Sequence, residues 1–379
     1  MPRAGGKLFA RFPDRRSRTQ LGNAERETPP YSQPVLNPDT AFDRERMRAV
    51  AAALAGQGVF LGTSSWKYPG WLGQLYTQDR YLHRGRFAET RFERLCLAEY
   101  AEVFPTVCVD AAYYRFPDAR FIGGLIEEVP PSFRFGLKVT DEITVRKFPR
   151  LPRFGTRAGS VNTNFLNADL FATAFLAPLV PHRAQIGVLI FEFSRFYPAD
   201  FARGRDFVEA LDGFLSRLPS GWPFGVEIRN PGFLKEPYFA ALARHRVAHV
   251  FNSWEAMPTV GEQMAMPGAF THPDLAAARF LLRPGRAYED AVKSFSPYTE
   301  VRDPCPEARA AGADLIRRVA GRAPGTPRSL YLFVNNRLEG NALATLRAMV
   351  EELRESATPP QGSPPTVSGT TDHDSPLKA

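Results

Sequence analysis

Short apolar runs alternate with amphipathic segments through most of the chain, from residue 59 to about residue 353. Several runs, such as IGVLIF and SLYLFV, are continuously apolar rather than alternating. Continuous apolar runs are typical of strands covered on both faces in a parallel sheet. The pattern predicts eight strands, at residues 59–62, 107–111, 133–139, 186–193, 224–228, 248–251, 279–282 and 329–334.

Helical periodicity lies between most of these runs. It is clearest at residues 87–103, 170–179, 201–218, 238–244, 308–320 and 342–353. Eight strands with intervening helices predict a single α/β domain that is a (β/α)8, or TIM, barrel. An open doubly wound sheet is the alternative. It is disfavoured because no glycine-rich phosphate turn opens the first helix.

The two ends of the chain lack this alternation. Residues 1–38 hold six prolines and are basic, and residues 355–379 are rich in Pro, Ser and Thr. Such segments bury too little apolar surface to fold, so both are predicted to be disordered tails. Between the first tail and the barrel, Asp39 can cap a helix within residues 39–58 that ends at Gly56 or Gly58. The barrel domain then spans residues 59–354.

Composition narrows the class of protein. No apolar run reaches 18 residues, so no membrane span is expected. Three widely spaced cysteines argue against a disulfide framework or a zinc cluster and favour a reducing, cytoplasmic location. Of the net charge of +8, residues 1–38 contribute +4 and residues 355–379 contribute −2, which leaves +6 in between. That excess suits a small anionic ligand, with nucleic acid as a further candidate partner, or it serves solubility alone. The oligomeric state stays open.

Candidate ligand-binding residues follow the first two strands. The segment GTSSWKYPGW places Trp66 and Tyr68 beside a lysine, a combination that suits a sugar, a base or a planar anion. Its tryptophans could equally be packing anchors. The second strand delivers Asp110, Tyr114 and Arg115, either as a functional group or as a satisfied ion pair.

Charged residues also lie inside the next strands. Lys138 stands in an apolar strand and needs an acid or an anionic ligand nearby. Glu227 and Arg229 are two residues apart, so both side chains lie on one face of a strand. They form either a functional pair or an internal salt bridge that fixes strand register. Glu192 lies among aromatic residues of the fourth strand.

The last two strands contribute an arginine and two amides. Arg283 is expected at the end of the seventh strand, and Asn335 and Asn336 follow the eighth. In a parallel barrel the carboxyl ends of all strands surround one pocket, so these groups are expected to converge.

Several familiar chemistries lack support. The histidines are scattered, so no metal site is predicted, although Mg²⁺ binding by Asp110, Glu192 and Glu227 remains an alternative. Neither a G-x-S-x-G elbow nor a phosphate-binding P-loop occurs, and no cofactor is predicted. Cys108 in mid-strand is interpreted as core packing.

Taken together, the motifs resemble one family. GTSSWKYPGW, VDAAYYRFP, FGLKVTDEIT, VEIRNPGF, the Arg283 segment and FVNNRLEGNA occur in the order of the YecE-like family, the domain of unknown function 72. The resemblance covers residues 59–350 and implies a closed TIM barrel, without an established reaction.

This chain departs from the family pattern at several positions. Residues 111–115 replace the family's Asn-Ser-Thr-Phe-Tyr-Arg run, and 191–195 replace Phe-Gln-Leu-Pro-Pro. Asn230 stands where the family has a histidine after the Glu-Phe-Arg motif. If that histidine is a general base, catalysis here is altered or absent.

Two functions remain under consideration. The first is an enzyme that acts on a small anionic, sugar or phosphate-type substrate, with Glu227 or Asp110 as acid or base and Lys138, Arg229 and Arg283 holding negative charge. The second is a non-catalytic binding module for an anionic partner such as nucleic acid, because many arginines lie on predicted helices.

Overall fold

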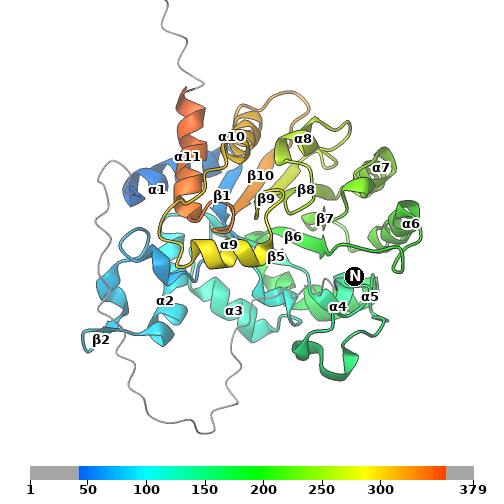
Figure 1. Ribbon diagram of the computed structural model, residues 1–379, viewed down its shortest axis with the longest axis horizontal. Coiled ribbons are helices and arrows are strands. Elements are labelled where there is room, and N and C mark those ends of the chain that lie inside the picture. Colours follow the sequence, from blue (N-terminus) through cyan, green and yellow to red (C-terminus); the bar gives the residue numbers. More distant parts are fainter. Residues whose placement is uncertain (1–41, 356–379) are drawn as a thin grey trace, which may run out of the picture.

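Eight parallel strands close into a barrel in the computed structural model, which describes residues 42–355 (Figure 1). The strands follow one another in chain order, and β1 closes the ring by pairing with both β10 and β4. The barrel strands are β1 (Val59–Thr63), β4 (Thr106–Val109), β5 (Arg134–Lys138), β6 (Ile186–Phe193), β7 (Phe224–Ile228), β8 (Ala248–Ser253), β9 (Leu275–Phe280) and β10 (Ser329–Val334). The predicted TIM-barrel fold is confirmed, and the open doubly wound sheet is wrong.

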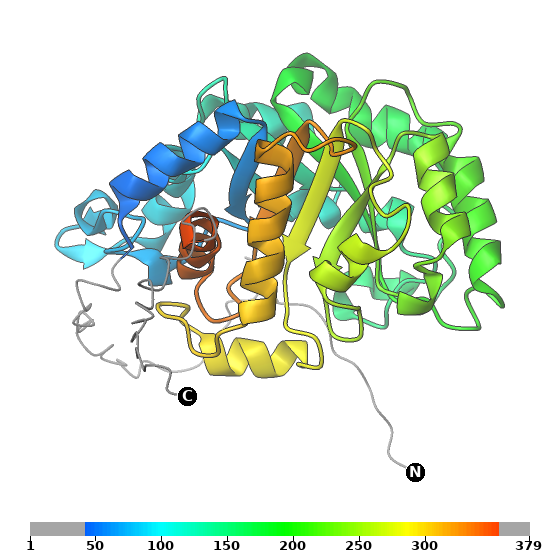
Figure 2. The ribbon, with the colours of Figure 1, turned by 90° about the horizontal axis from the view of Figure 1, so that it is seen from above.

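Helices surround this barrel (Figures 1 and 2). The α-helices are α1 (Arg44–Gly56), α2 (Glu89–Ala101), α3 (Ala119–Glu127), α4 (Asp141–Thr144), α5 (Ala168–Leu170), α6 (Gly204–Leu215), α7 (Glu236–Arg244), α8 (Val260–Ala265), α9 (Tyr288–Phe295), α10 (Pro306–Ala320) and α11 (Ala342–Glu355). Short 3-10 turns are η1 (Pro69–Trp71), η2 (Gln78–Tyr81), η3 (Ala111–Tyr113), η4 (Pro152–Arg157) and η7 (Pro231–Phe233). A small hairpin pairs β2 (Leu82–His83) with β3 (Arg86–Phe87).

Two apolar layers hold the barrel together. One lies inside it and includes Cys108, Val188, Val250 and Phe333, and the other lies between the strands and the helices. The burial of every residue of β6 explains why its sequence is apolar except at Glu192. Cys108 is fully buried in the inner layer, as the sequence indicated.

The seventh barrel strand differs from its predicted position. It runs as β9 over Leu275–Phe280, rather than over residues 279–282. Its sequence LAAARF contains three alanines, which carry little β-strand signal, whereas the following bulky apolar residues carry more. The correction places Arg279 within the strand and Arg283 beyond it.

The helix predicted at 170–179 is irregular. The chain there forms α5, a π-helical stretch η5 (Phe171–Leu176) and a 3-10 stretch η6 (Ala177–Gln185). Pro178 and Pro181 lack the N–H group that an α-helix needs, which accounts for the break.

The N-terminal helix is present as α1, and its cap is Asp43, whose carboxylate accepts a hydrogen bond from the Arg46 amide at 2.9 Å. The predicted cap Asp39 and the two predicted tails lie outside the described residues. The helix ends at Gly56, one of the two predicted stops. Within residues 42–355, no helix is long and apolar enough to cross a membrane.

One helix takes an unusual position. Figure 2 shows α9 lying across the end of the barrel toward which the strand arrows point. This is the carboxyl end of the strands, where ligands bind in barrels of this kind. The helix and its flanking loops therefore help to form the mouth of the barrel.

Candidate functional site

A layer of charged and polar side chains caps the apolar interior of the barrel. Side chains two residues apart on a strand face the same way. On six strands an inward-facing apolar or glycine residue is therefore followed, two residues later, by an inward-facing polar residue. The successive pairs are Cys108 and Asp110, Gly136 and Lys138, Ile190 and Glu192, Gly225 and Glu227, Val250 and Asn252, and Ala277 and Arg279. The strand pleat alone thus gathers these groups at the barrel mouth.

Ion pairs connect the charged members of this layer. Arg279 Nη1 lies 2.6 Å from Glu192 Oε2 and 2.7 Å from Glu227 Oε2. Arg229 Nη2 lies 2.5 Å from Glu227 Oε1 and 3.2 Å from Glu192 Oε2. The arginines therefore bridge the carboxylates of β6 and β7.

Lys138 joins the same network. Its Nζ lies 2.9 Å from Glu192 Oε2 and 3.7 Å from Asp110 Oδ1. The same Asp110 Oδ1 atom lies 3.7 Å from Arg279 Nη2. The predicted need of Lys138 for a nearby acid is met, and the side chain points into the barrel. We call these six residues (Asp110, Lys138, Glu192, Glu227, Arg229 and Arg279) the central cluster.

The central cluster is balanced, with three cations against three carboxylates. Burial would by itself raise the pKa of Glu192, but Lys138, Arg229 and Arg279 together hold this pKa well below its usual range. Burial would lower the pKa of Lys138 and of Arg279, but the neighbouring carboxylates raise both above their ordinary values. These groups therefore stay charged at neutral pH.

Aromatic rings form part of the wall around this cluster. Lys138 Nζ lies 4.1 Å from the centroid of the Tyr113 ring, and the Arg229 guanidinium lies 4.1 Å from that of Trp254. Such cation–π contacts stabilise a positive charge without neutralising it. Arg229 therefore has one side on an aromatic surface and the other on carboxylates.

Some donors of the central cluster remain unused. Within the described part of the chain, Nε and Nη1 of Arg229 and Nε of Arg279 are buried without a hydrogen-bond partner. Buried N–H groups are almost always paired in folded proteins. A ligand or ordered water with acceptor oxygens would satisfy them.

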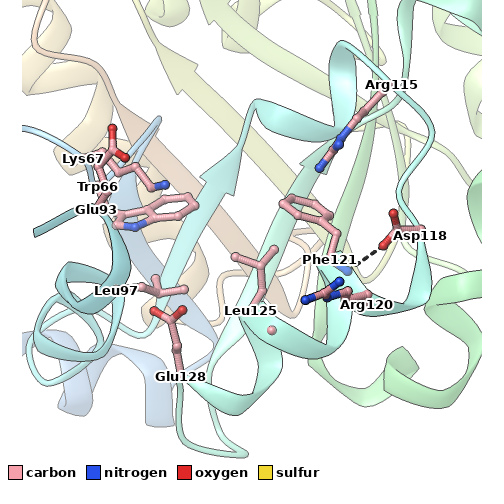
Figure 3. A pocket seen from close by; sticks show the side chains of 11 residues that line it. Trp66, Lys67, Glu93, Leu97, Arg115, Asp118, Arg120, Phe121, Leu125 and Glu128 are labelled. Carbon is pink, nitrogen blue, oxygen red and sulfur yellow. Dashed lines mark hydrogen bonds between the residues drawn. The ribbon is translucent and has the colours of Figure 1, made fainter. Parts of the chain in front are cut away.

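Trp66 and Arg115 lie elsewhere, in a groove between α2 and α3 of about 480 Å³ (Figure 3). Trp66, Lys67 and Leu97 lie on one side of the groove, and Arg115 and Phe121 lie on the other. The groove holds three cations and three carboxylates: Lys67, Arg115, Arg120, Glu93, Asp118 and Glu128. Burial raises the pKa of Glu128, an effect that Lys67 opposes. Of the residues predicted after the first two strands, Trp66 and Arg115 thus lie in this groove and only Asp110 lies in the central cluster.

Other predicted residues also lie apart from the central cluster. Arg283 pairs with Asp303, with 3.1 Å between Nη1 and Oδ1, because it follows β9 rather than ending it. Tyr114 is exposed, with Arg153 5.0 Å from its ring centroid. Tyr68 packs between Trp71 and Tyr298, at centroid distances of 4.8 and 5.6 Å.

Asn335 and Asn336 have largely local roles. The side chain of Asn335 accepts a hydrogen bond from the Arg337 amide at 3.0 Å, and that of Asn336 accepts one from the Ala342 amide at 2.7 Å. These bonds shape the turn between β10 and α11. The Nδ2 group of Asn336 is buried without a partner in the described structure.

The sequence-based reading missed two arginines. Arg279 is a charged residue in an apolar strand, the same signal that singled out Lys138. Because the predicted strand began at Arg279, this residue was expected at the amino end of the strand, away from the barrel mouth. Arg337 directly follows the two asparagines after β10, and its ring contact with Tyr288 depends on folding. All three carboxylates stand within predicted strands, but only Asp110 and Glu227 were predicted as catalytic, and Glu192 was named only as a possible Mg²⁺ ligand.

Metal and thiol chemistry find little basis in the geometry. Among residues 42–355, no three His, Cys, Asp or Glu side chains are grouped so that they could hold a metal ion. The carboxylates proposed for Mg²⁺ surround Arg279 and Lys138 instead. Burial raises the pKa of Cys108 to about 12, which keeps its thiol protonated at neutral pH.

Comparison with known proteins places the chain in a family. A family model described as "Protein of unknown function DUF72" matches residues 60–368. Two crystal structures of a DUF72 family protein from Enterococcus faecalis V583 match with a TM-score of 0.52 and 18% identity, over 78% and 79% of this chain and 95% and 98% of the other. A DUF72 family protein from Thermotoga maritima MSB8 matches at 18% identity and a TM-score of 0.47, over 79% of this chain and 98% of the other.

At 18% identity, the similarity to the two Enterococcus faecalis structures supports the fold alone. The search of curated proteins found no match to the sequence. The family model spans most of the sequence, and it agrees with the resemblance found in the motifs. The chain therefore belongs to the DUF72 family of proteins of unknown function.

Proposed function

We propose that this protein is an enzyme acting on a small anionic, sugar or phosphate-type substrate at the carboxyl-end mouth of its barrel. The observation that carries the proposal is the set of buried, unused N–H groups on Arg229 and Arg279, beside three carboxylates. These donors can bind acceptor oxygens of a substrate, and the carboxylates can transfer protons.

The free-energy cost of burying the charges of the central cluster supports a functional role for it. Removing charges from water costs several kcal/mol for each ion, and replacing buried ion pairs by apolar residues is often neutral or stabilising. Glu227, Arg229 and Arg279 are all almost fully buried. Apolar side chains at these positions would simply extend the interior core, so stability alone does not explain the cluster.

The carboxylates differ in their access to a substrate. Glu227 is fully buried and both its oxygens lie within ion-pair distance of an arginine, whereas the side chain of Asp110 is 37% exposed. A proton-transferring group must reach the substrate directly or through one water. We therefore assign Asp110 as the general acid or base and Glu227 as a positioning residue for the two arginines.

The alternative of a nucleic-acid-binding module has weaker support. It rested on helical arginines, but Arg244 pairs with Asp212 at 2.5 Å and Arg318 pairs with Asp314 at 2.8 Å. Paired charges attract a polyanion less than free ones do. The groove between α2 and α3 is also charge-balanced.

A ligand panel combined with one variant tests the proposal. The unfolding temperature of the protein is measured with inorganic phosphate, sugar phosphates, neutral sugars and small carboxylates. A ligand at 100 times its Kd stabilises the folded state by about 2.7 kcal/mol. We expect stabilisation by one of these classes, and turnover of a stabilising compound that falls at least about a hundredfold in Asp110→Asn.

The matched control is Asp274→Asn, which removes an exposed carboxylate from the opposite end of the barrel, just before β9. It should leave both stabilisation and turnover unchanged. Equal turnover in wild type and Asp110→Asn would overturn the catalytic assignment. Failure of the whole panel, with nucleic-acid binding that weakens steeply with salt, would favour the binding module instead.

A further inference from the structure

Arg337 is a largely buried cation at the barrel mouth without a carboxylate in contact. It follows β10, and within the described chain no carboxylate oxygen lies within 4 Å of it, since it takes part in none of the ion pairs there. Its Nε group is buried without a hydrogen-bond partner. In the central cluster, by contrast, each arginine contacts at least two carboxylates.

Tyrosines surround Arg337 instead of acids. The guanidinium lies 4.6 Å from the centroid of the Tyr288 ring, and its positive charge opposes the rise in pKa that burial gives the Tyr298 hydroxyl. Tyr68 packs against Tyr298 at 5.6 Å. These tyrosines come from the start of α9, the loop after α9 and the loop after β1, so three separate segments meet around one arginine.

This tyrosine-framed arginine is continuous with the central cluster. The Trp254 ring contacts Arg229 at 4.1 Å and lies 6.2 Å from Tyr288, which in turn contacts Arg337. An aromatic surface therefore runs from Arg229 to Arg337. A ligand lying on this surface could reach both arginines.

The chemistry of the surroundings selects the kind of group that Arg337 can bind. An arginine offers its N–H groups in a planar fork that matches the oxygens of phosphate or carboxylate. Burial raises the pKa of Tyr68 to about 12, so this hydroxyl stays protonated and can donate to an anion. Asp110 acts on Arg337 only from beyond ion-pair distance, so Arg337 lacks a carboxylate in direct contact at the mouth.

We propose that Arg337, framed by Tyr68, Tyr288 and Tyr298, is the subsite that binds the oxyanion of the substrate, a phosphate or carboxylate group. This inference rests on the proposed function and deepens it. The reacting part of the substrate then lies over the central cluster, between Asp110 and Arg229, while its anionic group is held at Arg337.

Titration calorimetry with two probes, inorganic phosphate and acetate, tests the subsite. Binding of at least one probe to the wild type is expected, and its affinity should fall about tenfold or more in Arg337→Met, because a charge-assisted hydrogen bond is lost. Arg337→Lys, which keeps the charge but not the fork, should bind with intermediate affinity. Preference for phosphate or for acetate identifies which oxyanion the site takes.

A stability measurement separates binding from a structural role. Without ligand, Arg337→Met should unfold at the same temperature as the wild type or a higher one, because it removes a buried cation that has no carboxylate in ion-pair contact. A lower unfolding temperature in this variant, with unchanged probe affinity in Arg337→Lys, would show a structural arginine and overturn the proposal. Arg328→Gln serves as the matched control and should leave probe affinity unchanged, since Arg328 precedes β10 at the opposite end of the barrel and pairs with Asp274.

The remaining outcomes distinguish this inference from the proposed function. Probe binding that survives in Arg337→Met but is lost in Arg229→Lys would move the anion site to the central cluster and overturn only the subsite. Stabilisation by neutral sugars, with neither phosphate nor acetate bound, would also overturn the subsite and leave the proposed function standing. If no compound of any class binds, both proposals fail.

Discussion

Arg279 on β9 and Glu227 on β7 contact each other across the barrel interior, with 2.7 Å between Nη1 and Oε2, although β8 separates their strands. The same Arg279 nitrogen also reaches Glu192 on β6. One guanidinium thus connects strands that share no backbone hydrogen bonds with its own. This contact gives the charged layer a structural role in addition to the proposed one in binding.

The first prediction concerns this contact. Glu227→Gln should lower the free energy of unfolding by about 3 kcal/mol, because removing one partner leaves buried arginine charge uncompensated. Combined with Arg279→Met, the loss should be smaller than the sum of the single losses by more than 1 kcal/mol. Urea denaturation of the four proteins measures this coupling.

The control for this cycle is an exposed pair on α10. Asp314→Asn removes a partner of Arg318, and surface pairs contribute at most about 1 kcal/mol. Equal losses for Glu227→Gln and Asp314→Asn would contradict a tightly coupled central cluster.

A second prediction concerns pH. His249 lies on β8 and is buried against α7, where its Nδ1 atom lies 3.1 Å from the Tyr238 hydroxyl. Burial lowers the pKa of His249 to about 4. In the unfolded chain a histidine has a pKa near 6.5 and gains a proton as the pH falls, while the folded protein does not. Stability should therefore decrease by about 2 kcal/mol between pH 7 and pH 5 from this residue alone.

The pH effect is measured as the difference in urea unfolding free energy at the two pH values. His249→Gln should reduce that difference, whatever its effect on stability at neutral pH. A difference as large in the variant as in the wild type would assign the pH dependence to other groups.

The third prediction concerns packing inside the barrel. A Cβ added at Gly136 would lie 2.6 Å from the Phe333 ring, which is fully buried and has little room to move. Gly136→Ala should therefore cost about 1–3 kcal/mol of stability through overpacking.

Gly213→Ala is the matched control. This glycine is exposed within α6, and no atom lies within 4 Å of an added Cβ. Alanine should stabilise the helix there by about 0.5–1 kcal/mol. Opposite signs for the two substitutions are expected in thermal unfolding, and the same sign would argue against a tightly packed interior.

The sequence predicted much of this structure for identifiable physical reasons. Seven of the eight strands are recognisable because bulky apolar residues mark segments buried on both faces, and β9 was misplaced because alanines give a weak signal. The spacing of Glu227 and Arg229 placed them on one face, since the strand period is two. Lys138 required an acid because an unpaired buried cation is costly.

The rest depends on contacts between distant segments. No local pattern indicates that Tyr68, Tyr288 and Tyr298 meet at Arg337, or that Trp66 lies in a groove with Arg115 rather than over the central cluster. The pairing of Arg283 with Asp303 likewise follows from where β9 ends. Sequence spacing fixes which way a strand residue faces, whereas loop residues are placed only by the complete fold.

A crystal structure of the protein soaked in inorganic phosphate tests the central claim most directly. The account predicts density for the anion at the carboxyl end of the barrel, within hydrogen-bond distance of the Arg337 guanidinium and on the aromatic surface that leads to Arg229. Density confined to the groove between α2 and α3, or to the outer surface of the helices, would contradict it.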